Sequence, residues 1–141
     1  MSITRIIFGF VTLLSFGTAS RAQDVVVVTP WDTRWNQMWP GFEQANLVGD
    51  PSQPGHYTVR LKFPPGFKIP PHAHSNAREI TVLSGTWYIG YGTSGDPSGL
   101  KVLPAGSFHT EPAGYPHYAE TREPTVIQVS GQGPMTSRPA N

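Results

Sequence analysis

The sequence GFKIPPHAHSNAREITVLSG, residues Gly66–Gly85, contains His72 and His74, two of the chain's five histidines, separated by a single alanine. Side chains alternate between the two faces of a β-strand, so residues two positions apart project to the same side. If this stretch is a strand, both imidazoles point at one place. Such a pair, with a carboxylate nearby, is suited to Mn, Fe, Co, Ni, Cu or Zn.

The second half of this stretch has the pattern of a strand that ends in a turn. Glu79 precedes the apolar run Ile80–Leu83, and Ser84 and Gly85 follow as turn residues. The next run, residues 86–92, is again rich in aromatic and β-branched residues, and we expect it to pair with 79–83 in a hairpin. Glu79 is the candidate carboxylate for the site.

A further candidate ligand, His117, lies about thirty residues after Gly85, the end of the first stretch. Residues Gly106–His117 read GSFHTEPAGYPH, a short run followed by the turn signal Pro112–Gly114 and then by His117. If the two stretches are neighbouring layers of one β-barrel, His117 faces the same cavity as His72 and His74.

These two stretches resemble the two sequence motifs of the cupins. The first motif, G-x5-H-x-H-x4-E-x5-G, is matched by Gly66, His72, His74, Glu79 and Gly85. The second, G-x5-P-x-G-x2-H-x3-N, is matched by Gly106, Pro112, Gly114 and His117, with Thr121 in place of the final Asn. The resemblance covers about residues 45–130. It implies an all-β fold, a double-stranded β-helix or jelly-roll barrel, with His72, His74, Glu79 and His117 as metal ligands.

One departure affects the carboxylate. The family usually has six residues between the glutamate of the first motif and its closing glycine, whereas five separate Glu79 from Gly85. Counted back from Gly85, the position in phase with Ile80 and Val82 is Arg78. Alternation therefore turns Glu79 away from the cavity unless a bulge re-aims it, and a site of three histidines is the alternative.

The rest of the chain also favours short strands. Residues 57–63 alternate apolar and polar side chains, as in a half-buried antiparallel strand. Further strands are expected at 25–28, 100–103 and 125–130, and 15 Gly and 15 Pro supply the turns. We expect a strand and Trp-rich segment at 23–44, short and helical or irregular in part, a barrel at 45–130 and a flexible tail at 131–141.

Residues 1–22 have the pattern of a secretory signal peptide. Arg5 precedes an apolar run of about a dozen residues, and Ser20 and Ala22 form a small-x-Ala ending. The run is shorter than the ~20 residues that a transmembrane helix needs. The expected protein is therefore secreted or periplasmic, and because it has no cysteine it does not depend on disulfides there.

Charge argues against two classes of partner. Without Arg5 and Arg21 the chain has eight basic and nine acidic residues, a formal net charge of −1. Nucleic-acid binding needs clustered Lys and Arg to neutralise phosphates, and no such cluster is present. We expect no nucleic-acid partner and no membrane association after signal cleavage.

Trp31, Trp35 and Trp39 recur every four residues. On a short helix they would form one aromatic stripe. The stripe either caps one end of the barrel or forms a homodimer interface; the alternative is an aromatic platform for a ring-shaped or sugar substrate.

The expected cofactor is one divalent transition metal, Fe, Mn, Zn, Ni or Cu, with open coordination positions. The resemblance implies a metal-dependent small-molecule enzyme, either an oxidoreductase of the dioxygenase-like sort or an isomerase or hydrolase. The alternative is a non-catalytic cupin that binds a metal or a small ligand. Arg78, His109 and Tyr88 are candidates to hydrogen-bond the metal ligands or to contact a substrate, and no catalytic residue is singled out.

Overall fold

The computed structural model describes residues 24–140, which form short strands and two 3₁₀ turns. The turns are η1 (Pro30–Asp32) and η2 (Pro97–Gly99); the strands are β1 (Asn36–Met38), β2 (Phe42–Val48), β3 (Gly55–Phe63), β4 (Lys68–His74), β5 (Arg78–Ser84), β6 (Thr86–Tyr91), β7 (Lys101–Pro104), β8 (Phe108–Glu111), β9 (His117–Glu120), β10 (Thr125–Gly133) and β11 (Ser137–Pro139). Among these residues no helix has the length and apolar character needed to cross a bilayer. The predicted signal peptide, residues 1–22, lies outside the described part of the chain.

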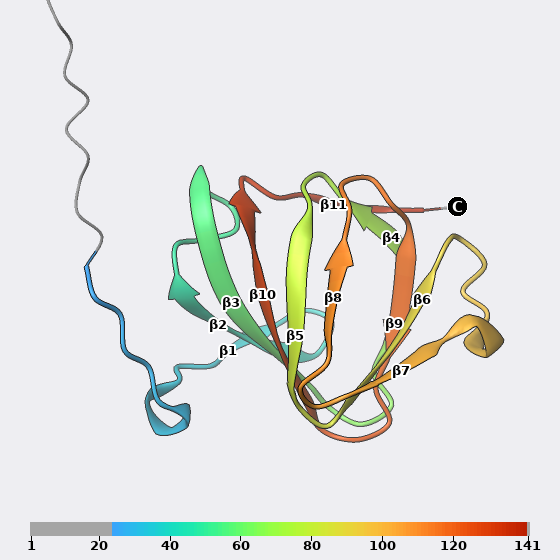
Figure 1. Ribbon diagram of the computed structural model, residues 1–141, viewed down its shortest axis with the longest axis horizontal. Coiled ribbons are helices and arrows are strands. Elements are labelled where there is room, and N and C mark those ends of the chain that lie inside the picture. The colour runs from blue at the N-terminus through green and yellow to red at the C-terminus, as the bar shows by residue number, and fades with distance from the viewer. Residues whose placement is uncertain (1–23, 141) are drawn as a thin grey trace, which may run out of the picture.

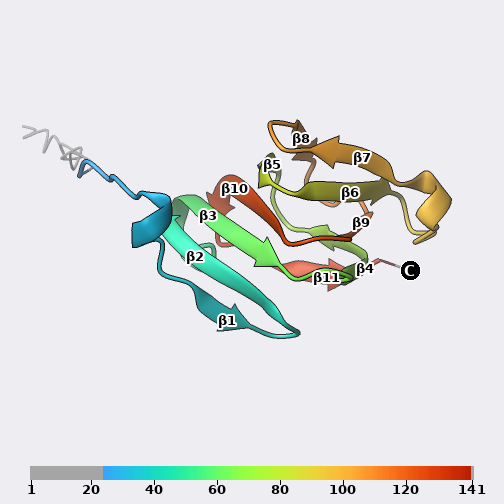
Figure 2. The same ribbon diagram turned by 90° about the horizontal axis from the view of Figure 1, so that it is seen from below.

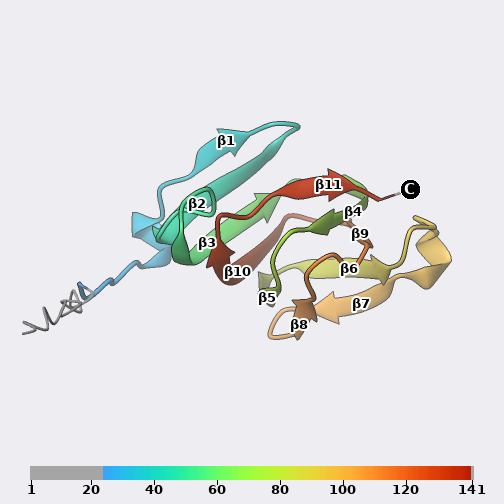
Figure 3. The same ribbon diagram turned by 90° about the horizontal axis from the view of Figure 1, so that it is seen from above.

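The strands form two antiparallel sheets (Figure 1). One has the order β1-β2-β3-β10-β5-β8 and the other β11-β4-β9-β6-β7. Figures 2 and 3 show the two layers from below and above, with β3 beside β10 in one sheet and β6 beside β7 in the other. The all-β jelly-roll prediction is confirmed.

Alternation along the strands builds the core between the sheets. In β3, β5 and β10 the buried residues alternate with less buried ones, so these strands turn one apolar face inward. The buried cluster consists of Tyr57, Val59, Phe63, Ile80, Val82, Trp87, Ile89, Ala119, Ile127 and Val129. The inward phase of β5 is set by Ile80 and Val82, which decides where Arg78 and Glu79 point.

The predicted hairpin between residues 79–83 and 86–92 is wrong. β5 pairs with β10 and β8, whereas β6 pairs with β7 and β9 in the other sheet. The turn between them contains Gly85 at φ 70°, and a Cβ there would lie 2.4 Å from the Pro124 carbonyl oxygen. Only glycine fits this left-handed, crowded turn, which carries the chain from one sheet to the other.

The C-terminal segment is not the loose tail predicted for residues 131–141. β10 continues to Gly133, and β11 pairs with β4 so that Ser137 lies opposite His74 and Pro139 opposite His72. The Ala140 amide also donates to the Pro71 carbonyl oxygen at 3.0 Å. The proline- and glycine-rich composition of this segment predicts no strand, and β11 forms because it pairs with β4.

Deleting residues 137–141 is expected to lower the free energy of unfolding by ~1–3 kcal/mol, because several backbone hydrogen bonds of ~0.5–1.5 kcal/mol net are lost. Urea unfolding of the truncated and full chains measures this. The control is Arg138→Ala, an exposed position whose backbone pairing with Ala73 is retained. A truncated chain as stable as the full chain would contradict a structural role for β11.

Two predictions for the N-terminal segment also fail. Residues 25–28 form no strand, and Val25 and Val27 are 93% and 81% exposed, because no neighbouring strand pairs with them. The tryptophans do not share a helix: Trp31 and Trp39 are 91% and 92% exposed, so they do not cap the barrel. A homodimer interface through these rings stays a prediction.

Candidate metal centre

The structure brings the three predicted histidines together. His72 and His74 lie on β4, and His117 begins β9, where it is the register partner of His72. Their ligand atoms all lie within 4.8 Å of one another. The site therefore forms on the inner face of one sheet, between two adjacent antiparallel strands.

Hydrogen bonds to backbone carbonyls orient two of the rings. Nδ1 of His72 donates to the Pro70 oxygen at 2.9 Å, and Nδ1 of His117 donates to the Tyr115 oxygen at 3.1 Å. A carbonyl oxygen only accepts, so Nδ1 carries the proton and each neutral ring keeps a lone pair on Nε2. Metal-binding histidines are commonly held in this way.

The Nε2 atoms are placed as ligands of one ion would be. Nε2 of His72 lies 3.1 Å from Nε2 of His74. Nε2 of His117 is buried and has no hydrogen-bond partner among residues 24–140. A cation at the point where these atoms converge would satisfy all three, so the residues fit a divalent metal.

Burial keeps two of these histidines neutral. It lowers the pKa of His74 to about 2, with smaller contributions from the charges of Arg78, His72 and His117. Burial also lowers the pKa of His72, more than its bond to Pro70 raises it. A metal ion needs the neutral imidazole, so these rings require no deprotonation at neutral pH.

These shifts predict that the metal-free protein loses stability as the pH falls below about 6.5, the ordinary histidine pKa. The unfolded chain then binds protons that the folded chain does not, which favours unfolding. In EDTA, the free energy of unfolding by urea should be lower at pH 5.0 than at pH 7.5. His74→Gln should make this dependence shallower, whereas equal values at the two pH values would contradict neutral buried histidines.

Glu79, the predicted carboxylate ligand, is not part of this cluster. It is exposed on the outer face of β5, in register with Thr110 and Ser130. The bulge that would have turned it inward does not form between the histidines and β5, so Arg78 takes the inward position in phase with Ile80. Of the four predicted ligands, only the three histidines come together, as in the alternative predicted from the sequence.

A different carboxylate, which neither sequence motif marks, lies beside the histidines. Glu111, at the end of β8, is 2% exposed, and its Oε2 lies 3.3 Å from His117 Nε2 and 3.9 Å from His74 Nε2. Arg78 donates to the same oxygen, from Nε at 2.9 Å and from Nη2. Burial raises the pKa of Glu111, but the Arg78 guanidinium and His117 together lower it by more, so its pKa lies below the ordinary value.

The other predicted contacts divide between the two faces. His109 is two positions before Glu111 on β8, shares its inward face, and its Nδ1 lies 3.3 Å from the Tyr91 hydroxyl. Glu111 could have been identified from the sequence in this way, because it lies two residues after His109 and therefore faces the same side of the strand. Tyr88 faces outward, because Trp87 and Ile89 take the inward positions of β6, and the Arg122 guanidinium lies 4.2 Å from its ring centroid.

A cavity of about 30 Å³ lies inside the barrel beside the centre. Its lining combines the polar side chains of His72, His117, Arg78 and Glu111 with the apolar ones of Leu61, Phe63, Ile69, Trp87, Ala119 and Ile127. Such a space holds about two water-sized molecules.

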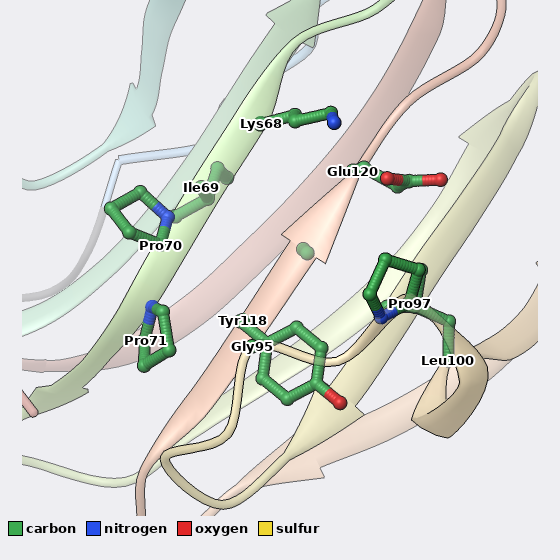
Figure 4. Close-up of a pocket in the computed structure, with 10 residues that line it drawn as sticks. Lys68, Ile69, Pro70, Pro71, Gly95, Pro97, Leu100, Tyr118 and Glu120 are labelled. Carbon is green, nitrogen blue, oxygen red and sulfur yellow. The ribbon is translucent and has the colours of Figure 1, made fainter. Parts of the chain in front are cut away.

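A larger hollow of about 270 Å³ lies over β4, β9 and the η2 loop (Figure 4). Its lining includes Lys68, Pro71, Tyr118 and Glu120, and the Tyr118 hydroxyl donates to the Asp96 carbonyl oxygen. Tyr118 alternates along β9 with His117, so this hollow and the histidines are on opposite faces of the sheet. The hollow is separate from the centre.

Two facing antiparallel sheets with three inward histidines, on the strands that carry the two sequence motifs, define a cupin. The model of the ChrR cupin-like domain family matches residues 23–136, and the chain belongs to this family. The resemblance found in the sequence is thereby confirmed.

Relatives in rice (Oryza sativa subsp. japonica) are germin-like proteins. The chain is 35% identical over 115 residues to putative germin-like protein 8-1, covering 74% of this chain and 52% of that protein. Germin-like protein 8-2 is 38% identical over 91 residues, covering 59% and 41%. The chain thus spans about half the length of these relatives, or less.

Solved structures with the same fold include several enzymes. The polyketide cyclase RemF from Streptomyces resistomycificus superposes with a TM-score of 0.69 at 18% identity, covering 84% of this chain and 87% of that one. An acetylacetone dioxygenase from Acinetobacter johnsonii gives 0.67 at 16% identity, covering 87% and 83%. At these identities the similarity shows the fold alone.

Proposed function

We propose that the protein is a metal-dependent enzyme that acts on a small molecule, with dioxygenase-like chemistry at the centre formed by His72, His74 and His117. The convergence of three Nε2 atoms carries this proposal, because the ligand atoms lie within 4.8 Å of one another. Two of the rings are held by backbone carbonyls through Nδ1, which leaves Nε2 of each as the candidate ligand atom.

A bound divalent metal with open positions supplies Lewis-acid or oxygen chemistry. The chain's own residues define what reaches it. The cavity of about 30 Å³ is large enough for a molecule the size of dioxygen or two waters. Arg78 and Glu111 form an ion pair in this cavity, and the Glu111 carboxylate lies beside His117.

The acetylacetone dioxygenase with a similar structure shows that this fold carries oxygen chemistry in another protein, and at 16% identity the similarity to this chain is one of fold. Three imidazoles also suit Zn, Ni and Cu, so the ligand set does not select the metal. We propose Fe or Mn because these metals fit the proposed oxygen chemistry.

The second candidate is a cupin that binds a metal or a small ligand without turnover. The cavity volume favours it, because about 30 Å³ leaves no space for an organic substrate inside the barrel. In the enzyme, such a substrate would approach from outside and only its reacting atoms would enter.

We also propose that the protein is secreted or periplasmic and loses residues 1–22. The basic residue, apolar run and small-x-Ala ending of the N-terminus support this. N-terminal sequencing of protein recovered from the periplasm or medium of an expressing bacterium tests it; recovery in the cytoplasm with an intact N-terminus would overturn it.

Metal analysis of the purified protein, followed by oxygen uptake with a panel of small phenols, diketones and sugars, tests the function. The enzyme is expected to contain about one divalent metal per chain and to consume oxygen with at least one panel member, and His72→Ala is expected to lose both properties. Metal without turnover, with a co-purifying ligand, would favour the second candidate. A chain that takes up no metal under anaerobic loading would overturn both.

A further inference from the structure

We propose that Glu111, on β8 in the opposite sheet, is a carboxylate ligand of the metal held by His72, His74 and His117. The inference depends on the metal centre of the proposed function and specifies its ligand set. It replaces Glu79, which points away from the site, with a residue 32 positions further along the chain.

The distances are those of ligands around one ion. Metal–nitrogen and metal–oxygen bonds of ~2.1 Å place two ligands ~3 Å apart at a right angle and ~4.2 Å apart on opposite sides. Three of the separations among these four groups are 3.1 Å between the Nε2 atoms of His72 and His74, 3.3 Å from Glu111 Oε2 to His117 Nε2, and 3.9 Å from that oxygen to His74 Nε2. All three fall within this range.

The contact between Glu111 and the neutral form of His117 brings two acceptors together. His117 Nδ1 carries the ring proton, since it donates to the Tyr115 carbonyl, so Nε2 presents a lone pair in the neutral ring. Glu111 Oε2 is also an acceptor, and it lies 3.3 Å away without forming a hydrogen bond with that nitrogen, which has no partner among residues 24–140. Two buried acceptors that face each other are unfavourable, and a metal ion between them satisfies both.

Arg78 makes the arrangement compatible with burial. A carboxylate that is 2% exposed needs a partner for its charge, and the Arg78 guanidinium supplies one from the inward position of β5. Each carboxylate oxygen has more than one lone pair, so hydrogen bonds from Arg78 leave room for a metal. The guanidinium thus holds Glu111 toward the histidines in the way that outer-sphere partners orient metal ligands.

Cobalt binding to the metal-free protein tests the ligand assignment directly. Co²⁺ is titrated into wild type, Glu111→Gln and Glu79→Gln, and both the dissociation constant and the visible d–d absorption spectrum are recorded. Glu111→Gln is expected to bind at least ~10-fold more weakly, with a changed d–d spectrum, because a ligand is lost. Glu79→Gln makes the same chemical change on the outer face and is expected to match wild type in both.

Three outcomes would overturn the assignment. If Glu111→Gln matches wild type in affinity and spectrum, Glu111 does not contact the metal. If affinity falls while the spectrum is unchanged, Glu111 acts through His117 as a positioning residue. If wild type itself binds no Co²⁺, the metal centre fails together with this inference, which distinguishes that failure from the first two.

Glu111→Gln leaves Arg78 without its charge partner, and the variant is at risk of not folding. The double variant Arg78→Gln/Glu111→Gln removes both charges, and Arg78→Gln alone keeps the carboxylate. We expect the double variant to show the altered d–d spectrum of Glu111→Gln, and Arg78→Gln, which keeps the carboxylate, to differ from it. Identical spectra for these two variants would overturn the assignment.

Discussion

Replacing His74 with alanine is expected to weaken metal binding at least ~100-fold, more than the 10- to 100-fold typical of changes to outer-sphere partners, because a ligand is removed. Its Nε2 lies 3.1 Å from that of His72, and its side chain is only 6% exposed. Water reaches the vacated position poorly and cannot replace a fixed imidazole. Titration of the metal-free protein with Zn²⁺ or Co²⁺, together with the metal content after purification, measures the loss.

His56→Ala is the matched control, since it makes the same substitution at an exposed histidine at the start of β3. It should bind metal as wild type does, and circular dichroism should show the same sheet content for all three proteins. A His74→Ala variant with wild-type affinity would remove His74 from the ligand set and leave the proposed centre without support.

Phe63→Ala is expected to lower the free energy of unfolding by ~3–5 kcal/mol, a large part of the ~5–15 kcal/mol that holds a typical domain folded. Phe63 is 3% exposed at the end of β3. Its ring centroid lies 5.2 Å from that of Trp87 and 5.3 Å from those of Phe42 and Phe67. Removing the ring leaves a void that joins the interior cavity, which Phe63 also lines.

Urea unfolding at neutral pH measures this loss, and Phe108→Ala provides the comparison. Phe108 is 59% exposed on β8, so the same deletion there should change the free energy of unfolding by no more than ~0.5 kcal/mol. Equal losses at the two positions would show that the aromatic cluster around Phe63 is not the stabilising core.

Local patterns in the sequence were sufficient for the class of fold and for three of the groups at the centre. The H-x-H spacing puts His72 and His74 on one face of β4 because a strand repeats every two residues. The same alternation identified Arg78 as the inward residue of β5, in phase with Ile80 and Val82. Keeping Glu79 as a ligand required a bulge that turns it inward, and in the structure Glu79 faces outward.

Other features depend on which strands become neighbours. The hairpin expected across Gly85 is absent because the next strand joins the other sheet, and β11 was missed because its partner, β4, lies more than sixty residues earlier. Glu111 has no motif of its own. It meets His117 only because β8 and β9 belong to different sheets that face each other.

The amino-acid sequence by itself therefore determined most of the strands and the shared face of His72 and His74, since these follow from short-range alternation, and the resemblance of its two motifs to those of the cupins added His117 to the same centre. Only the tertiary structure decided which carboxylate accompanies them. Facing sheets bring together side chains that no local spacing relates, and a shift of one residue in register exchanges the inward Arg78 for the outward Glu79.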